Sequence, residues 1–244
     1  MERKLLFLLI FLMLFSGVFA QYKKIAVLVY TSPDVYHNPS VPVAITELKK
    51  LAAKNFMDLD WTQMESNFCD SILNHYSVVV FLHANDSKLN DIQRKSLQDF
   101  IRSGKGFVGI HACSVRGSEW FQQLVGRTFI RHPEKQTAVM TVVDDQFPAT
   151  FHLPRKWVWT DEWYEFGDAL TGGQHVLLTV DESSYFVEVG MGNFHPVAWY
   201  QQFDGGRSFY TALGHIEDAY TDKLFLDHLF GGIYWAATGK GILK

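Results

Sequence analysis

The chain has 244 residues, of which 48% are hydrophobic and 20% are charged, and its formal net charge is −4. This composition is that of a globular protein, and the length allows one sizeable domain. A weakly acidic chain offers no electrostatic basis for binding nucleic acid or an anionic membrane, so both partner classes are excluded as expectations.

Residues 1–20 have the pattern of a secretory signal peptide. The basic residues Arg3 and Lys4 precede an apolar run, and Val18-Phe19-Ala20 places small residues around a cleavage site. The apolar stretch is about 15 residues, shorter than the roughly 20 that a spanning helix needs. We therefore expect an exported protein, periplasmic or extracellular, in which residues 21–244 form a single domain with no membrane span after cleavage.

The first half of the remaining chain alternates between predicted strands and predicted helices. Short apolar runs predict strands at 23–31, 56–63, 76–84 and 105–112, and helical patterns follow at 41–55, 67–76, 89–104 and 118–126. Continuous rather than alternating apolarity indicates parallel strands that are covered on both faces. In the third helix, Asn90 or Asp91 is expected to be the cap and Gly104 the end. This order predicts an α/β fold with a mostly parallel central sheet and helices on both faces.

After Gly126 the pattern changes. Further strands are predicted at 136–144, 175–181, 195–203 and 206–215, and an amphipathic helix closes the chain at 221–239. The segment 147–167 is aromatic and interrupted by proline, so we expect it to be irregular. The sequence contains no internal repeat and no linker that would divide it into two domains.

Histidines follow four of the predicted strands. His37 comes after the first strand, His83 and Asn85 after the third, His111 after the fourth and His215 after the last. Ligands of open parallel sheets bind beyond the carboxyl ends of the strands, and imidazole titrates near neutrality. We therefore expect His111 and His215 to be acid/base residues and His37 to contact the substrate.

Three segments of the second half add further candidates, each combining a titratable group with rigid or aromatic neighbours. Asp161 and Glu162 are candidate catalytic residues that would orient the histidines; adjacent side chains diverge, so one should face the site while the other makes structural hydrogen bonds. The substrate-binding candidates are His37, His132, Trp163, Tyr164, His195 and Trp199. Of these, the rings of Trp163, Tyr164 and Trp199 would stack on sugar faces.

Other chemistries have weaker support. No histidine pair has H-x-H or H-x-x-x-H spacing, so metal ligands would have to come from separate loops. We expect no resident cofactor and leave a divalent metal open. Cys113 lies two residues beyond the expected turn at His111, so it is not expected to be a nucleophile, nor to pair with Cys69. The sequence has no G-x-S-x-G motif and no phosphate-binding loop.

Six motifs, taken in order, resemble one known family. They are GKGFVGIHA, RHPEKQTA, WTDEWYEF, LLTVDES, HPVAW and GGRSFYTALGHIEDAY. Over residues 24–239 the chain resembles the ThuA-like, or trehalose-utilisation, family, which looks like a divergent branch of the class I glutamine amidotransferase-like superfamily. The resemblance implies a flavodoxin-like three-layer α/β fold. Amidotransferases have their catalytic cysteine where this chain has His111, so glutamine amidotransfer is not expected.

The resemblance also implies a role with trehalose and related disaccharides, through 3-keto-glycosides that a sugar dehydrogenase of the same pathway would supply. The leading hypothesis is an exported lyase, hydrolase or isomerase that acts on such sugars by histidine-based acid/base chemistry. A non-catalytic sugar-binding or accessory protein and a metal-dependent hydrolase are the alternatives. The expected ligand is a small carbohydrate, and a homo-oligomer is left open.

Overall fold

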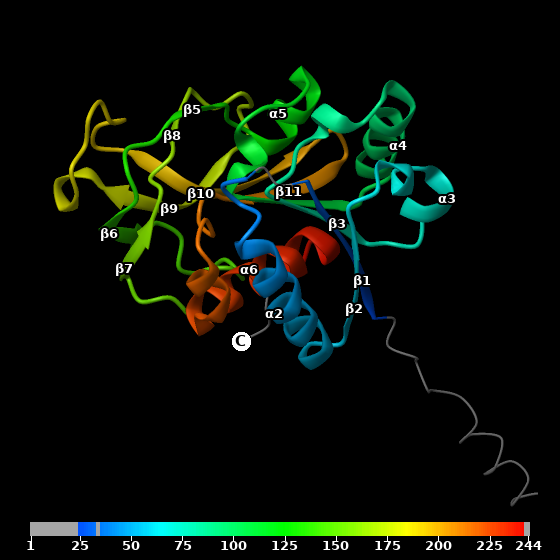
Figure 1. Ribbon diagram of the computed structural model, residues 1–244, viewed down its shortest axis with the longest axis horizontal. Coiled ribbons are helices and arrows are strands. Elements are labelled where there is room, and N and C mark those ends of the chain that lie inside the picture. The colour runs from blue at the N-terminus through cyan, green and yellow to red at the C-terminus, as the bar shows by residue number, and fades with distance from the viewer. Residues whose placement is uncertain (1–23, 33–34, 242–244) are drawn as a thin grey trace, which may run out of the picture.

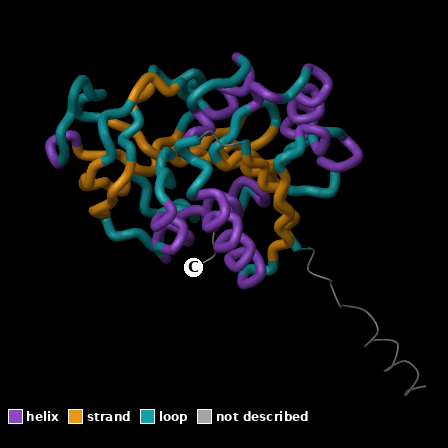
Figure 2. The backbone as a smooth tube through the Cα atoms, viewed as in Figure 1, coloured by secondary structure: helices purple, strands orange, loops and turns teal. Residues whose placement is uncertain are grey.

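One large sheet runs through the part of the chain described by this computed structural model, residues 24–32 and 35–241. Helices cover both of its faces, so the domain has three layers (Figure 1). The strands form a continuous middle layer between helices and loops (Figure 2). The expected signal peptide, residues 1–20, lies outside the described residues.

Within the described residues the sheet has nine strands in the order β2-β1-β3-β4-β11-β10-β9-β6-β7. Their bounds are Ile25–Thr31 for β1, Met57–Thr62 for β2, Val78–Leu82 for β3, Gly106–Ile110 for β4, Gln136–Val142 for β6, Lys156–Asp161 for β7, His175–Asp181 for β9, His195–Phe203 for β10 and Gly206–Thr211 for β11. All pairs from β2 to β11 are parallel, and all pairs from β11 to β7 are antiparallel. The predicted parallel sheet is confirmed, and an antiparallel half extends it. Two further short strands, β5 (Phe129–Arg131) and β8 (Glu165–Phe166), pair separately.

The helices pack in two layers. Their bounds are Ser40–Lys54 for α2, Asp70–Leu73 for α3, Asp91–Arg102 for α4, Glu119–Val125 for α5 and Lys223–Thr238 for α6. Helices α2 and α6 lie on one face, and α3, α4 and α5 lie on the other (Figure 1). Five 3₁₀ turns complete the described elements: η1 (Glu65–Asn67), η2 (Asp86–Lys88), η3 (His111–Ser114), η4 (Glu182–Ser184) and η5 (Glu217–Thr221). The predicted α/β three-layer fold is therefore confirmed.

Local sequence explains how these elements form. Every residue of β3 and β4 is buried, as expected of parallel strands covered by helices on both faces. Asn90 caps α4 with a capping box that includes Gln93, which satisfies free N–H groups of the first turn. Helix α6 approaches β4 so closely that a Cβ at Gly106 would lie 2.2 Å from the carbonyl oxygen of Ala236. Only glycine fits at that contact.

The expectation that the segment 147–167 is irregular holds for residues 147–155 and is wrong for most of the rest. This segment contains β7, which pairs antiparallel with β6, and the short β8. Trp157 is buried whereas Val158 is 63% exposed, so the strand has the alternation of a half-buried antiparallel strand. Charged residues at its start and Pro154 before it hide that short alternation in the sequence.

None of the described helices combines the length and the apolar character needed to cross a bilayer.

Cys69 and Cys113 are both free thiols. Cys113 is fully buried, and burial followed by the charge of Asp86 raises the pKa of its thiol well above the usual value. A thiol in this state is a poor nucleophile at neutral pH.

The core contains a histidine whose titration should make stability depend on pH. His228 in α6 is fully buried, its Nδ1–H donates to the Ala149 carbonyl oxygen at 2.8 Å, and burial lowers its pKa to about 4. The unfolded chain binds this proton near pH 6.5, before the folded protein does. The share of the free energy of unfolding that depends on a neutral His228 is thus fully present above pH 6.5. It falls as the pH drops toward 4, by about 1.4 kcal/mol per pH unit and about 3 kcal/mol in total.

Chemical denaturation of wild type and His228→Asn at several values between pH 7 and pH 4.5 measures this effect. Asparagine retains an N–H donor for Ala149 but does not titrate. The free energy of unfolding of the variant should fall less steeply over this range. Equal slopes in the two proteins would show that His228 does not carry the dependence.

Candidate active site

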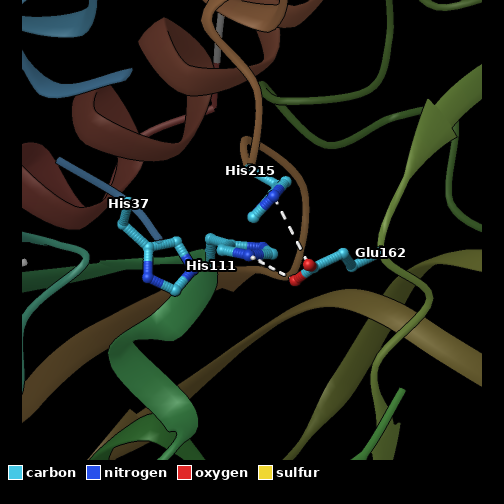
Figure 3. Close-up of side chains that lie close together, drawn as sticks. All are labelled: His37, His111, Glu162 and His215. Carbon is cyan, nitrogen blue, oxygen red and sulfur yellow. Dashed lines mark ion pairs between the residues drawn. The ribbon is translucent and has the colours of Figure 1, made fainter. Parts of the chain in front are cut away.

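Histidines from four strand ends converge with one carboxylate at the carboxyl edge of the parallel strands. His37 lies in the loop after β1, His111 follows β4, His215 follows β11, and Glu162 comes from the end of β7 (Figure 3). His83, which follows β3, stacks on His37 with a centroid distance of 4.7 Å. We refer to His37, His83, His111, His215 and Glu162 as the histidine–glutamate cluster.

The imidazole rings of the cluster are in mutual contact. His37 lies 5.1 Å from His111 and 5.2 Å from His215, measured between ring centroids, and His111 lies 5.2 Å from His215. His37, His83 and His111 are buried, whereas His215 is partly exposed. Four histidines this close cannot all be cations, because like charges at these distances repel strongly in a buried setting.

Two of these histidines have a strained backbone. His83 has a φ of 48° and His111 a φ of 52°, both in the left-handed region that residues with a side chain rarely occupy. They follow adjacent strands, in which Leu82 pairs with Ile110, and the N–H of His83 donates to the Ile110 carbonyl oxygen at 3.3 Å. Two neighbouring strand-end turns of this kind place two imidazoles side by side. Such strain concentrates at functional sites.

The contacts of Glu162 connect the cluster to a further histidine. His111 Nε2 lies 3.3 Å from Glu162 Oε2, His215 Nε2 lies 3.3 Å from Oε1, and His132 Nε2 lies 3.6 Å from Oε2. The side chain of His132 is 34% exposed, compared with 0% for His111. Glu162 is therefore the common neighbour of three imidazoles, one of which faces solvent.

These surroundings fix the charge states of the site. Burial raises the pKa of Glu162, but a hydrogen bond with His111 and the positive charges of three histidines outweigh it and lower the pKa to about 2. Burial, followed by the charge of His111, lowers the pKa of both His83 and His215. At neutral pH the cluster thus holds an ionised carboxylate, and protonation of His83 and His215 is disfavoured.

Asp161 and Glu162 diverge as their adjacency suggested. Asp161 is fully buried and accepts four hydrogen bonds. The donors are the backbone N–H groups of Gly214 at 2.8 Å, His215 at 3.2 Å and Glu162 at 2.9 Å, and Trp159 Nε1 at 3.0 Å. Asp161 therefore positions Glu162 and the His215 loop, and Glu162 alone faces the cluster.

Three of the expected sugar-binding residues lie in the core instead. Trp163 and Trp199 are fully buried, and their indole N–H groups donate to the carbonyl oxygens of Gln136 and Val125. His195 is also fully buried, between Glu182 Oε1 at 2.8 Å and the carbonyl oxygen of Tyr164 at 2.9 Å. None of these rings presents a face to a ligand. Trp163 packs on Tyr185, and Trp199 packs on Phe166 and Tyr210.

Tyr164 and His83 have roles that the sequence did not reveal. Tyr164 is almost fully buried, its hydroxyl group lies 2.8 Å from His111 Nε2, and its ring stacks on His132. It contacts the cluster rather than solvent. His83 follows a predicted strand but is not among the expected site residues; Ser40 Oγ lies 3.1 Å from its Nε2. Its position matches that of His111 on the neighbouring strand, and this is the signal that could have identified it.

A cavity of about 310 Å³ opens beside the cluster. It is lined by Tyr36, Pro39, Ser40, Lys135, His215, Ile216, Glu217 and Asp218. Its volume lies at the lower end of the range of small-molecule sites, and its lining combines charged and hydrogen-bonding groups. His215 belongs to both the cavity and the cluster, so a ligand in the cavity would contact the cluster through this residue.

The comparisons with known proteins identify the family. The sequence profile described as "ThuA: Trehalose utilisation" matches residues 26–236. The chain belongs to the ThuA family. No curated protein matches the chain.

Solved structures of ThuA-like proteins have the same fold. One from Bacteroides uniformis is 24% identical with a TM-score of 0.76, covering 91% of this chain and 94% of that one. Another, from Parabacteroides merdae, is 22% identical with a TM-score of 0.74, covering 91% and 93%. A protein from Thermoplasma acidophilum described as part of a GMP synthase is 12% identical with a TM-score of 0.56, covering 88% and 96%. At these identities the likeness shows the fold alone.

The role of Asp161 as a positioning residue can be tested through stability. Each carboxylate oxygen of Asp161 accepts from two N–H groups. In Asp161→Asn one oxygen becomes an NH₂ group, so two buried hydrogen bonds are lost and the NH₂ group faces two N–H donors. We expect the free energy of unfolding to fall by about 2–4 kcal/mol. Asp181→Asn, at a cap that accepts from Ser183 near the surface, should lower the free energy of unfolding much less. Urea denaturation measures both, and equal losses would contradict the special role of Asp161.

Proposed function

We propose that this ThuA family member is an enzyme that acts on a small carbohydrate, of the disaccharide or 3-keto-glycoside class, by proton transfer at the histidine–glutamate cluster. The observation that carries the proposal is the convergence of His111, His215 and His132 on Glu162 beside a cavity of about 310 Å³. Family membership supports the substrate class, since the family is described by trehalose utilisation.

The chemistry of a 3-keto-glycoside suits such a site. The keto group acidifies the C–H bond at the neighbouring carbon, C2. A base removes that proton, and the C1–O bond then breaks as the electron pair forms a C1=C2 double bond. An acid protonates the departing glycosidic oxygen, and water adds across the double bond to give the free keto sugar. These reaction steps need no oxidant or reductant.

The accessible residues in the cluster and His132 beside it suit these steps. His215 lines the cavity and is neutral at pH 7, because burial lowers its pKa, so it serves as the base. His132 is the most exposed of the three imidazoles around Glu162, and a proton on its Nε2 would be held beside that carboxylate, so it is the proposed acid. His111 is fully buried and its Nε2 lies 3.3 Å from Glu162 Oε2, so it is a positioning residue for that carboxylate.

Export of the protein is a further part of the proposal, and it rests on the pattern of residues 1–20. Processing before Gln21 would give a mature chain that meets its substrate outside the cytoplasm, where a sugar dehydrogenase of the same pathway would supply it. N-terminal sequencing of the protein recovered from the periplasm or medium checks this. A chain that retains residues 1–20 would count against it.

Assays on 3-keto-trehalose and related 3-keto-glucosides test the catalytic proposal. Wild type should release free keto sugar, and Glu162→Gln should lower kcat by at least about 100-fold, because the side chain keeps its shape but loses the charge that orients the acid and the base. Glu119→Gln, an exposed residue of α5, is the matched control and should retain wild-type kcat.

Two results would overturn the enzyme proposal. One is no turnover of any substrate in the panel by wild type, with or without added divalent metal ions. The other is equal activity of wild type and Glu162→Gln. Tight binding of these sugars without turnover would instead establish a sugar-binding or accessory protein.

A further inference from the structure

We propose that His37, His111, His215 and Glu162 form a binding site for one divalent transition metal ion, with Zn²⁺ as the ion that fits the donors best. One donor atom of each residue lies within 4.8 Å of the donor atoms of the other three. Figure 3 shows these side chains turned toward one another at the strand ends. The site shares His215 and Glu162 with the proposed reaction, so its part in sugar chemistry rests on the proposed function, whereas metal binding itself is tested without any sugar.

The spacing of the donors matches the size of a zinc site. At zinc–ligand distances of 2.0–2.1 Å and tetrahedral angles, donor atoms stand about 3.3 Å apart. Glu162 Oε2 lies 3.3 Å from His111 Nε2, and Oε1 lies 3.3 Å from His215 Nε2. The widest donor pairs must close by about 1–1.5 Å to reach tetrahedral spacing. His37 and His215 lie on loops rather than strands, so such a movement does not disturb the sheet.

Hydrogen bonds behind two rings direct the other ring nitrogen toward the same carboxylate oxygen. His111 Nδ1 lies 2.6 Å from the Ala212 carbonyl oxygen, and His132 Nδ1 lies 2.8 Å from that of Pro133. A carbonyl oxygen only accepts, so both Nδ1 atoms carry a hydrogen, and each ring presents its Nε2 to Glu162 Oε2. Where such an Nε2 is unprotonated, its lone pair repels the carboxylate oxygen, and a cation beside them removes that repulsion.

The bond from His111 to Ala212 is also the arrangement that metal-binding histidines use. Such histidines donate their other ring N–H to a carbonyl or carboxylate, which fixes the tautomer and the ring orientation. A second observation points the same way: within the described residues, the buried His215 Nδ1 and the buried His83 Nδ1 have no hydrogen-bond partner. His83 is 2% exposed and stacks on His37, so a buried polar atom adjoins a proposed ligand.

The donor set narrows the identity of the ion. Three imidazoles and one carboxylate suit Zn²⁺ and its first-row neighbours, whereas Mg²⁺ and Ca²⁺ prefer sites built of oxygen ligands. The nearby thiol, Cys113, is buried among apolar residues, so it offers no soft ligand to the cluster. Because His215 lines the cavity, a ligand in the cavity reaches the ion's open position from that side. Such an ion polarises a keto oxygen as a Lewis acid.

Tyr164 offers an internal test of this arrangement. Its hydroxyl group lies 2.8 Å from His111 Nε2, the same nitrogen that would bind the ion. An O–H that donates to this nitrogen competes with the metal. Tyr164→Phe should therefore bind the metal as tightly as wild type or more tightly. Tyr164 is buried, so if this substitution only disrupted the packing of the cluster, metal binding would become weaker.

The experiment measures Zn²⁺ and Co²⁺ binding to the full-length protein prepared without a polyhistidine tag and stripped with a chelator. Wild type should bind one equivalent of either ion, with a rise in Tm on Zn²⁺ addition. His111→Ala, His37→Ala and Glu162→Gln should each weaken binding by at least about 100-fold, since even residues behind metal ligands account for 10–100-fold. His175→Ala, an exposed histidine of β9, is the control and should bind like wild type.

The outcomes separate this inference from the proposed function. No stoichiometric binding by wild type, or an equal loss in His175→Ala and His111→Ala, would overturn the metal site. An equal loss in Tyr164→Phe would also overturn it, because it would show general disruption rather than ligand loss. Turnover of 3-keto-glycosides by chelator-treated protein would support the enzyme proposal and would show that the ion is not needed for the reaction. One equivalent of Zn²⁺ with no turnover of any sugar would support the site and count against the proposed function.

Discussion

The carboxylate of Asp161 connects the two halves of the sheet at the point where the site forms. Asp161 ends β7, the last strand of the antiparallel half, yet it accepts the N–H groups of Gly214 and His215 from the loop after β11. Through the next residue it also places Glu162. The candidate site is therefore composite: the parallel half supplies histidines, the antiparallel half supplies the anion, and one buried carboxylate sets the distance between them.

The histidine–glutamate cluster lowers the stability of the fold, because it combines strained backbone with buried polar and charged groups. Two histidines have left-handed backbone, several imidazoles are buried against one another, and a carboxylate remains ionised beside them. A core of apolar residues would have none of these costs. Elsewhere in the chain the fold avoids such conflict: β3 and β4 are entirely apolar, and α4 begins with a complete capping box. Local strain and buried charge within an otherwise consistent fold are typical of functional sites.

The sequence predicted what depends on periodicity and chain order. The apolar runs indicated the parallel strands, and the strand-end rule was enough to group His37, His111 and His215. The sequence did not predict which way a side chain turns within an aromatic segment. Trp163 and Tyr164 follow Glu162 in the chain, yet the ring of Trp163 packs in the core and the hydroxyl of Tyr164 contacts His111. The direction of each side chain depends on packing against distant strands. His83 was undervalued because its left-handed turn is a tertiary property that a single sequence does not display.

The left-handed turn after β4 decides where the imidazole of His111 lies. His111 has a φ of 52°, and its ring joins the other histidines at the carboxyl edge of the parallel strands. With Nδ1 bonded to the Ala212 carbonyl oxygen, the ring presents Nε2 to a carboxylate that comes from the far half of the sheet. Cys113, two residues later, is fully buried, and burial raises the pKa of its thiol. The turn therefore supplies an imidazole, not a thiol, to the cluster.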